Sequence, residues 1–375
     1  PLISYVIKGE IKKNYFNPDN IFDEIHFITF TKKETSINNI KITTGRAKCF
    51  VHVFSPLSTY DFLYPLSRIN KISNHIANLK FDVVRAYNPI IHGYIAGKIS
   101  KKFDLPFIIS LHGNYDLDIR YQYKKNKDVR YFKYLFTKYT IEKKALNMAT
   151  HIIGAYEFAS KFALDNGISK HKVSTIYNRV YLDFYKPTKY RKPSKELKVI
   201  CVGRLIKEKG QRTLLKAMKI LNKNITLTIV GDGEDFDILK KMVSDYDLKQ
   251  RVKFIKSVAN SELSSIYQEH EIFALPIKYG GICIPALEAT ACGLALVMPK
   301  PLHEDESEII SEYSLIVENT PEGFARGINN IFSNSDLKKK MIKKGLDTIL
   351  KYQGSVMETK EAQLYKKIIE NYEIS

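Results

Sequence analysis

The sequence predicts an α/β fold with two tandem domains, each built on a doubly wound parallel sheet. Short runs of β-branched and aromatic residues alternate with helical patterns, once in the first half of the chain and again in the second. Such alternation favours parallel strands joined by helices. The length of 375 residues suits two domains, because one domain typically takes about 150 residues. A charged segment with two prolines and little apolar content, 186–196, is interpreted as the linker.

We predict a first domain at 1–188, a second at 189–355, and a C-terminal helix at 356–375 that packs back on the first domain. The strands predicted in the first half are 2–7, 24–30, 49–54, 82–87, 106–113, 151–156 and 172–178, and the helices are 59–79, 90–103, 130–147 and 157–166. Strands are predicted in the second half within 197–203, 224–233, 252–257, 271–277, 295–299 and 314–319, with helices from about 209, near 234–246 and 261–268, around 288, and from about 321 to 373. We expect a cleft between the carboxyl ends of the two sheets, where such folds bind ligands.

Composition excludes several classes of protein. The apolar share of 44% is typical of a globular chain, and no apolar run is long enough to span a bilayer. The chain opens at Pro1 without the pattern of a signal peptide, so we expect a cytoplasmic location. The cysteines lack CxxC spacing and are interpreted as reduced thiols rather than a disulfide or zinc framework. They are Cys49, Cys201, Cys283 and Cys292.

Positive charge is concentrated in the first half of the chain. Residues 1–190 carry 30 Lys and Arg against 15 Asp and Glu, whereas 191–375 carry 29 against 25. This asymmetry indicates an anionic partner for the first half, such as membrane headgroups, a lipid diphosphate or nucleic acid. A general preference for lysine is the alternative.

Two segments of the second half predict a site for a diphosphate. VICVGRLIKEKG, from residue 199, places Arg204 and Lys209 five positions apart after a strand, and GGICIPALEATACGLALV, from residue 280, enters another helix. Two cations at one strand-to-helix junction, facing a second helix N-terminus, suit a diphosphate. Because no metal-ligand set accompanies them, the pattern suggests an enzyme that uses a nucleotide sugar.

These segments resemble the retaining glycosyltransferases of family 4, which have the GT-B fold of two Rossmann-like domains. VGRLIKEKG (202–210), IVGDGE (229–234) and GGICIPALEATACGLALV (280–297) carry the resemblance, with looser matches in LPFIISLHGN and IYNRVYLDFYKP. The resemblance implies that a UDP- or GDP-sugar is the donor, and that the acceptor is a saccharide or a polyprenyl-linked saccharide of cell-envelope polysaccharide biosynthesis. It implies no cofactor and no metal. The donor-binding residues implied are Gly9, Gly203, Gly231, Gly281, Ile282, Cys283, Ile284 and Glu288, beside the catalytic residues His112, Arg204 and Lys209.

The chemistry of the reaction fits these residue types. Arg204 and Lys209 would neutralise the leaving diphosphate, and backbone amides at the next helix N-terminus would add donors. Glu288 would accept hydrogen bonds from the ribose hydroxyls, or would simply be favoured by the helix dipole. Gly231 lies in a Gly-Asp-Gly turn whose purpose can be purely structural. The alternative for Arg204 and Lys209 is that they are ordinary surface charges, which is what they would usually be outside this sequence context.

One departure from the family pattern affects the predicted activity. The family's first glutamate, eight positions before Glu288, is replaced by Gly280. Three interpretations remain open: an unusual donor sugar, a substituting acid such as one in 303–306, or a protein with weak or no turnover. The last would make the chain a nucleotide-sugar-binding protein.

Two regions of the first half can face the donor sugar, the acceptor or a membrane. His112 and Asn114 follow a predicted strand, where an imidazole could hydrogen-bond the sugar or acceptor. The basic and aromatic segment 120–144 contains Lys124, Lys125 and Arg130, and suits an anionic membrane surface on the inner face of the membrane. Several of its residues fall at helical spacing and are expected to share one face of a helix: Tyr131, Tyr134, Leu135, Lys138 and Ile141. The alternative for this segment is a core-facing helix with a solvated lysine face. Nucleic acid is not expected as a partner, since no zinc spacing, RNP-like strand or basic heptad is present.

Overall fold

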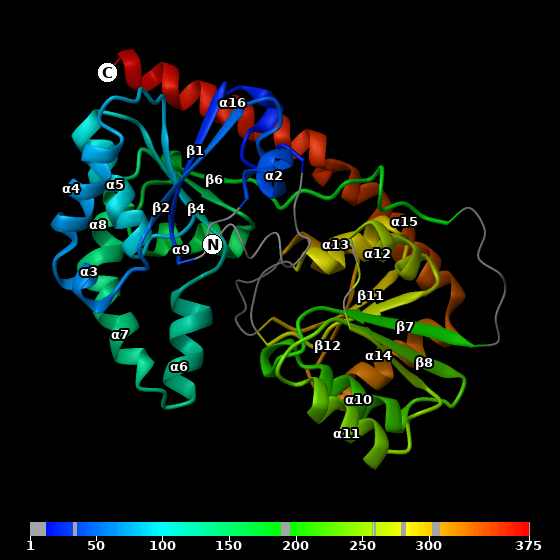
Figure 1. Cartoon of the computed structure of the whole chain (residues 1–375). Helices are drawn as coiled ribbons and strands as arrows, with labels where there is room; N and C mark the ends of the chain where they lie inside the picture. Colours follow the sequence, from blue (N-terminus) through cyan, green and yellow to red (C-terminus); the bar gives the residue numbers. More distant parts are fainter. Residues whose placement is uncertain are drawn as a thin grey trace. The chain divides into compact units, whose positions relative to one another are not determined.

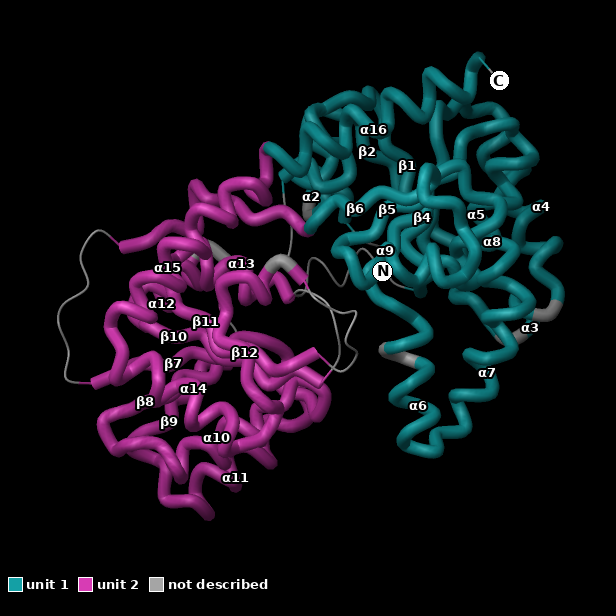
Figure 2. The backbone as a smooth tube through the Cα atoms, turned by 180° about the vertical axis from the view of Figure 1, so that it is seen from behind, with its two compact units in different colours: residues 1–177, 356–375 teal, residues 178–355 magenta. Residues whose placement is uncertain are grey.

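The computed structural model describes residues 13–32, 36–188, 196–256, 258, 260–278, 283–301 and 308–374. The chain divides into two compact units (Figures 1 and 2): unit 1 comprises Pro1–Tyr177 with Val356–Ser375, and unit 2 comprises Asn178–Ser355. Helices and parallel strands alternate in both units, which confirms the predicted α/β fold with two parallel-sheet domains. The predicted strand 2–7 lies outside the described residues.

Unit 1 contains two parallel sheets. β1 (Glu24–Phe30) pairs with β2 (Lys48–Phe54), and a second sheet has the order β3-β4-β5-β6. The strands of this second sheet are β3 (Val84–Ala86), β4 (Phe107–Leu111), β5 (His151–Gly154) and β6 (Val173–Thr175). β4 is buried along its whole length, as expected of an apolar strand covered on both faces. The helices are α2 (Ile37–Ile40), α3 (Thr59–Leu63), α4 (Pro65–His75), α5 (Ile91–Phe103), α6 (Tyr121–Lys125), α7 (Arg130–Thr137), α8 (Lys143–Met148), α9 (Glu157–Asp165) and most of α16 (Gly354–Ile374).

Two of the predicted helices of unit 1 are interrupted. The helix predicted at 59–79 divides at Tyr64, which leaves the helical region because Pro65 follows it. The helix predicted at 130–147 contains a π-helical turn, Lys138–Glu142, between α7 and α8. Glu142 of that turn is buried and ion-paired with Arg120. Neither interruption was predicted, although Pro65 is a recognisable signal for the first of them.

Unit 2 contains one six-stranded parallel sheet with the order β12-β11-β10-β7-β8-β9. The strand order reverses between β7 and β10, and ligands of such sheets bind beyond the carboxyl ends of the strands at that point. The strands are β7 (Leu197–Val202), β8 (Ile225–Val230), β9 (Val252–Ile255), β10 (Ile272–Ala274), β11 (Ala295–Pro299) and β12 (Leu315–Val317). The helices are α10 (Gln211–Ile220), α11 (Phe236–Asp245), α12 (Asn260–Gln268), α13 (Ile284–Ala291), α14 (Pro321–Ser333) and α15 (Ser335–Ile349).

The C-terminal helix α16 contributes to the core of unit 1. Tyr365 and Ile368 pack with Ile108 of β4 and Ile153 of β5. Near the end of the helix, the Tyr372 hydroxyl donates to the Asp104 carboxylate at 3.1 Å. In the described part of the chain, no helix combines the length and the apolar character needed to cross a membrane.

Candidate active site

The loops that follow β7 and β8 cross backbone to backbone at the carboxyl edge of the unit 2 sheet. The Gly203 amide donates to the Val230 carbonyl at 3.0 Å. A Cβ on Gly231, whose φ is +144°, would lie 2.1 Å from the Gly203 carbonyl oxygen. Glycine is therefore required at 231, because a side chain would meet backbone and an unfavourable φ together. The crossing fixes the backbone from which Arg204 departs.

Arg204 and Lys209 border the same glycine from the two ends of one loop. The exposed Arg204 directly follows Gly203, and its carbonyl accepts a 3.0 Å hydrogen bond from the buried Gln211 side chain. Lys209 is half-buried at the end of a 3-10 turn, Lys207–Lys209, and its Cδ lies 3.8 Å from where a Gly203 Cβ would be. Both predicted cations thus belong to the loop at the carboxyl end of β7, beside the reversal in strand order.

The segment that leads into α13 is hydrogen-bonded to this loop. The Lys278 amide donates to the Glu208 carbonyl at 2.9 Å. Cys283 is the buried N-cap of α13 and Ile284 is its first residue. Burial raises the pKa of the Cys283 thiol, and the positive charge of Lys209 acts in the opposite direction. The positive charge of Lys209 therefore acts at the N-terminus of α13, whose backbone dipole also favours anions.

Glu288 lies in the second turn of α13 and is buried, with 6% of its surface exposed. The Tyr267 hydroxyl donates to its carboxylate at 3.3 Å. Burial, followed by the nearby Glu288 charge, raises the pKa of Tyr185. The first turn of α13 has no acidic residue, so attraction to the helix N-terminus does not explain Glu288. A buried carboxylate of this kind requires hydrogen-bond donors.

His112 follows β4 at the carboxyl edge of the second sheet of unit 1. Its ring stacks on Tyr87, with centroids 5.8 Å apart and planes inclined by 20°, and its carbonyl accepts a 2.8 Å hydrogen bond from the Tyr156 hydroxyl. His112 is exposed as a residue, and the protein atoms packed around its imidazole still desolvate the ring in part. This desolvation, with a smaller effect of the Arg85 charge, lowers its pKa to about 4. His112 is therefore neutral at neutral pH.

Of the remaining predicted site residues, the structure describes Asn114 but not several of the others. Asn114 is buried, and its side chain fastens the loop: Oδ1 accepts from the Asp116 and Leu117 amides, and Nδ2 donates to the Phe158 carbonyl. Gly9, Gly280, Gly281, Ile282 and the acidic run 303–306 lie outside the described residues.

Comparison with known families decides the identity of the chain. Residues 23–184 match the family described as Glycosyltransferase Family 4, and residues 185–348 match the one described as Glycosyl transferases group 1. The two matches are consecutive and together cover most of the chain. The chain belongs to glycosyltransferase family 4.

Individual relatives of this glycosyltransferase agree with the family match. An uncharacterised glycosyltransferase of Methanocaldococcus jannaschii is 28% identical over 320 residues, which cover 79% of this chain and 76% of the relative. The structure of a sucrose-phosphate synthase from Thermosynechococcus elongatus has a TM-score of 0.72 at 17% identity, covering 96% of this chain and 98% of that one. HepE of Anabaena, solved in complex with UDP, has a TM-score of 0.68 at 15% identity, covering 92% and 100%. These structures support the GT-B fold.

The basic segment of the glycosyltransferase forms a hairpin of α6 and α7 with exposed apolar side chains. The residues that the pattern singled out, Tyr131, Tyr134 and Leu135, are half-buried. The opposite side of the helix carries Phe132 and Phe136, which are 71% and 56% exposed. We name the whole exposed set the hairpin surface. It consists of Val129, Phe132, Phe136 and Tyr139 with the cations Lys124, Lys125, Lys127 and Arg130.

Tyr60 of α3 and Tyr64, which lies between α3 and α4, add further exposed rings that the sequence analysis missed. Tyr60 and Tyr64 are 59% and 60% exposed, and their rings lie 5.0 Å apart. The Lys133 ammonium of α7 lies 5.1 Å from the Phe62 ring of α3, which links the two regions. The i, i+4 spacing of Tyr60 and Tyr64 was visible in the sequence, but the exposure of their rings was not.

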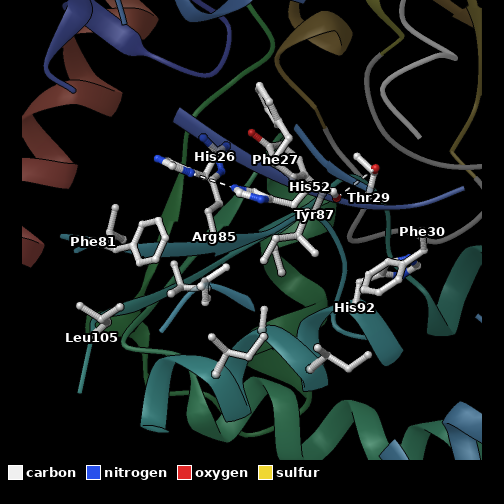
Figure 3. Close-up of a pocket in the computed structure, with 18 of the residues that line it drawn as sticks. His26, Phe27, Thr29, Phe30, His52, Phe81, Arg85, Tyr87, His92 and Leu105 are labelled. Atoms are coloured by element: carbon white, nitrogen blue, oxygen red, sulfur yellow. Dashed lines mark hydrogen bonds between the residues drawn. The ribbon is translucent and has the colours of Figure 1, made fainter. Parts of the chain in front are cut away.

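Unit 1 also contains a cavity of about 560 Å³ (Figure 3). Its walls include the consecutive residues 26–30 of β1 and 83–88 around β3, so it separates the edges of the two sheets. His26 and His52 line it, and their ring nitrogens lie 2.9 Å apart; His52 contacts His75 in the same way. Among the described residues, no group of His, Cys, Asp or Glu side chains has an arrangement that could hold a metal ion.

Arg85, at one wall of this cavity, is the centre of a polar cluster that the sequence did not reveal. Its guanidinium donates to Ser110 Oγ at 2.8 Å and to Glu361 Oε1 and Tyr365 Oη at 2.5 Å each. Its Cζ also lies 4.6 Å from the centre of the Tyr87 ring. Partners up to 280 positions apart meet here, so no local pattern could have indicated them.

Proposed function

We propose that this family 4 enzyme is a retaining, metal-independent hexosyltransferase. It moves a sugar from a UDP- or GDP-sugar to a saccharide or lipid-linked saccharide in cell-surface polysaccharide assembly. The observation that carries the proposal is the juxtaposition of Lys209 with Gly203 and with the N-terminus of α13, since it gathers positive potential at the carboxyl edge of the sheet. The UDP-bound structure of HepE, which has a similar fold, supports a nucleoside diphosphate as the leaving group.

The cations act on the charge that grows as the donor breaks. When the bond between the anomeric carbon and the β-phosphate oxygen lengthens, negative charge accumulates on the diphosphate. Lys209 supplies a point charge and Arg204 a planar guanidinium that can bind two phosphate oxygens. The α13 amides add donors at the same edge. Fixed donors of this kind stabilise the transition state, because they need no reorganisation as the charge develops.

The acceptor replaces the diphosphate on the same face of the sugar. The acceptor oxygen forms a bond to the anomeric carbon while the bond to the β-phosphate oxygen breaks, and the acceptor proton moves to a β-phosphate oxygen. The lowered pKa of His112 makes its imidazole a weak base, so its role is to hydrogen-bond a sugar hydroxyl rather than to take this proton. Glu288, buried beside Tyr267, is assigned to the ribose hydroxyls.

Release of nucleoside diphosphate from a panel of UDP-, GDP- and ADP-sugars, with and without saccharide acceptors, tests the proposal. We expect one nucleotide to be preferred, release to continue in EDTA, and the product to keep the donor's anomeric configuration. Arg204→Ala should lose about 3 kcal/mol of transition-state stabilisation, or roughly a hundredfold in rate. The control is Arg326→Ala, which removes an exposed arginine of α14.

Two outcomes separate this function from its alternative. Saturable binding of a nucleotide sugar without transfer or hydrolysis would favour a nucleotide-sugar-binding protein, the interpretation motivated by Gly280. An equal loss of rate in Arg204→Ala and Arg326→Ala would contradict the role assigned to Arg204.

We also propose that the hairpin surface docks on an anionic membrane and receives a lipid-linked acceptor there. Exposed Phe132 and Phe136 suit the interfacial region, and nearby cations such as Lys124 and Lys125 suit anionic headgroups. Each cation near such a surface contributes about 1 kcal/mol. The core-facing alternative does not account for rings that are more than half exposed.

Co-sedimentation with vesicles of neutral or anionic lipid tests this docking. Phe132→Ser with Phe136→Ser should reduce binding to anionic vesicles by about tenfold or more. Phe332→Ser changes an exposed ring of α14 and serves as the control. Binding that is independent of lipid charge, or unaffected by the double change, would contradict the proposal.

A further inference from the structure

His112 is the last member of a chain of contacts that begins on α16. Glu361 and Tyr365 of this helix both hydrogen-bond Arg85, at 2.5 Å each. The Arg85 guanidinium lies over the Tyr87 ring, 4.6 Å from its centre, and Tyr87 is stacked on His112 at 5.8 Å. A residue at the carboxyl edge of β4 is thus connected to a helix that follows it by more than 200 positions in the sequence.

The guanidinium is fixed in both position and plane. The Arg85 side chain is 16% exposed and that of Glu361 is 8% exposed, so each charge depends on the other for compensation. Ser110 of β4 adds a bond to Nε at 2.8 Å, and a planar guanidinium held at both Nε and Nη1 cannot rotate. A change on α16 therefore reaches Arg85 directly.

The orientation of the Tyr87 ring is set by packing rather than by a hydrogen bond of its own hydroxyl. Within the described residues, the buried Tyr87 hydroxyl has no hydrogen-bond partner. Three groups orient the ring: Arg85 over one face, His112 stacked on it, and Phe16 edge-on at 5.6 Å. Displacement of Arg85 would therefore release both Tyr87 and the ring stacked on it.

We propose that Arg85, Glu361 and Tyr365 are positioning residues that hold the His112 imidazole through the Tyr87 ring. The inference rests on the proposed function, since His112 matters to turnover only if it contacts the sugar. Arg85 also places a positive charge near His112, and Glu361 partly offsets it; among the described residues, these are the charged groups that act on the imidazole. Tyr87 and Tyr365 face the same cluster, and burial raises the pKa of the Tyr87 hydroxyl.

NMR of the histidine-labelled full-length chain tests this inference independently of activity. Tyr365→Phe removes one bond to Arg85, whereas Tyr372→Phe removes a hydroxyl of the same helix that bonds Asp104 instead. We expect the His112 ring resonances to shift in the first variant and to stay in place in the second. With the preferred donor, kcat should fall by about tenfold in Tyr365→Phe while KM changes by less than about threefold.

A second variant keeps the test decisive if Tyr365→Phe is poorly folded. Glu361→Gln retains an oxygen acceptor but loses the charge that opposes Arg85, so the pKa of His112 should fall. His112 resonances and pKa unchanged in both α16 variants would overturn the inference, whatever their activity. If the enzyme proves to have no transferase activity, the proposed function fails while the NMR readout still decides the positioning.

Discussion

Replacement of Gly231 by alanine tests whether the crossing of the β7 and β8 loops holds the loop after β7 in place. The new Cβ would lie 2.1 Å from the Gly203 carbonyl oxygen, and the residue would have to adopt a φ of +144°. Backbone strain of this kind costs about 1–3 kcal/mol, and overpacking costs a similar amount. The free energy of unfolding is therefore expected to fall by about 4 kcal/mol, which lowers the Tm of unit 2 by roughly 8–16 °C.

Gly293→Ala is the matched control within the same unit. Gly293 also has a positive φ, of +74°, but the nearest atom to an added Cβ is a Pro187 carbon at 3.4 Å. Gly293→Ala should lower the free energy of unfolding only by the cost of the left-handed backbone conformation, about 1–2 kcal/mol. Scanning calorimetry measures both variants, and nucleotide binding below the transition measures the displacement of Arg204. Equal destabilisation by the two substitutions would refute the claim that backbone contact fixes this loop.

Three further predictions concern the site and its protonation. Lys209→Met should weaken nucleoside diphosphate binding by about ten- to a hundredfold, whereas Lys207→Met, at an exposed position of the same turn, should change it by less than about threefold in calorimetric titration. Glu288→Gln should weaken binding of ribonucleotides by about tenfold yet leave deoxyribose analogues little changed, and equal losses for both would contradict the ribose assignment. Burial lowers the pKa of His151 to about 4, so the unfolded state binds more protons between pH 4 and 6.5 and the free energy of unfolding should fall by about 2 kcal/mol as pH is lowered through that range. His151→Gln should remove this part of the pH dependence in denaturant titrations, and an unchanged profile would contradict it.

The sequence was sufficient to predict most of the fold, because a buried strand has a recognisable pattern within its own few residues. β4 and β7 are mostly apolar, and the described strands fall within the predicted segments or within one residue of them. Breaks inside helices were harder to predict. The division before Pro65 had a recognisable signal in the proline, whereas the π-helical turn Lys138–Glu142 has none.

The candidate site was only partly predictable for a related reason. The cations of the β7 loop lie within one short segment, so Arg204 and Lys209 could be proposed from spacing and resemblance. The position of Lys209 relative to the N-terminus of α13 depends on distant backbone bonds, such as that between Lys278 and Glu208. Arg85 and Glu361 are 276 positions apart, and their pairing exists only in the folded unit.

The hairpin surface illustrates a different limit of the sequence. Aromatic residues at helical spacing were correctly taken as one face of a helix, but Tyr131 and Tyr134 belong to the half-buried side. Phe132 and Phe136 are exposed instead. Both faces of α7 are aromatic, so periodicity alone could not say which one faces solvent.

Calorimetric titration with a nucleoside diphosphate and its monophosphate, UDP against UMP and GDP against GMP, tests most directly whether the loop after β7 binds the β-phosphate. We predict that the β-phosphate of the preferred base strengthens binding by about 2–3 kcal/mol, or roughly thirty- to a hundredfold. Equal affinity for the diphosphate and the monophosphate would contradict the account.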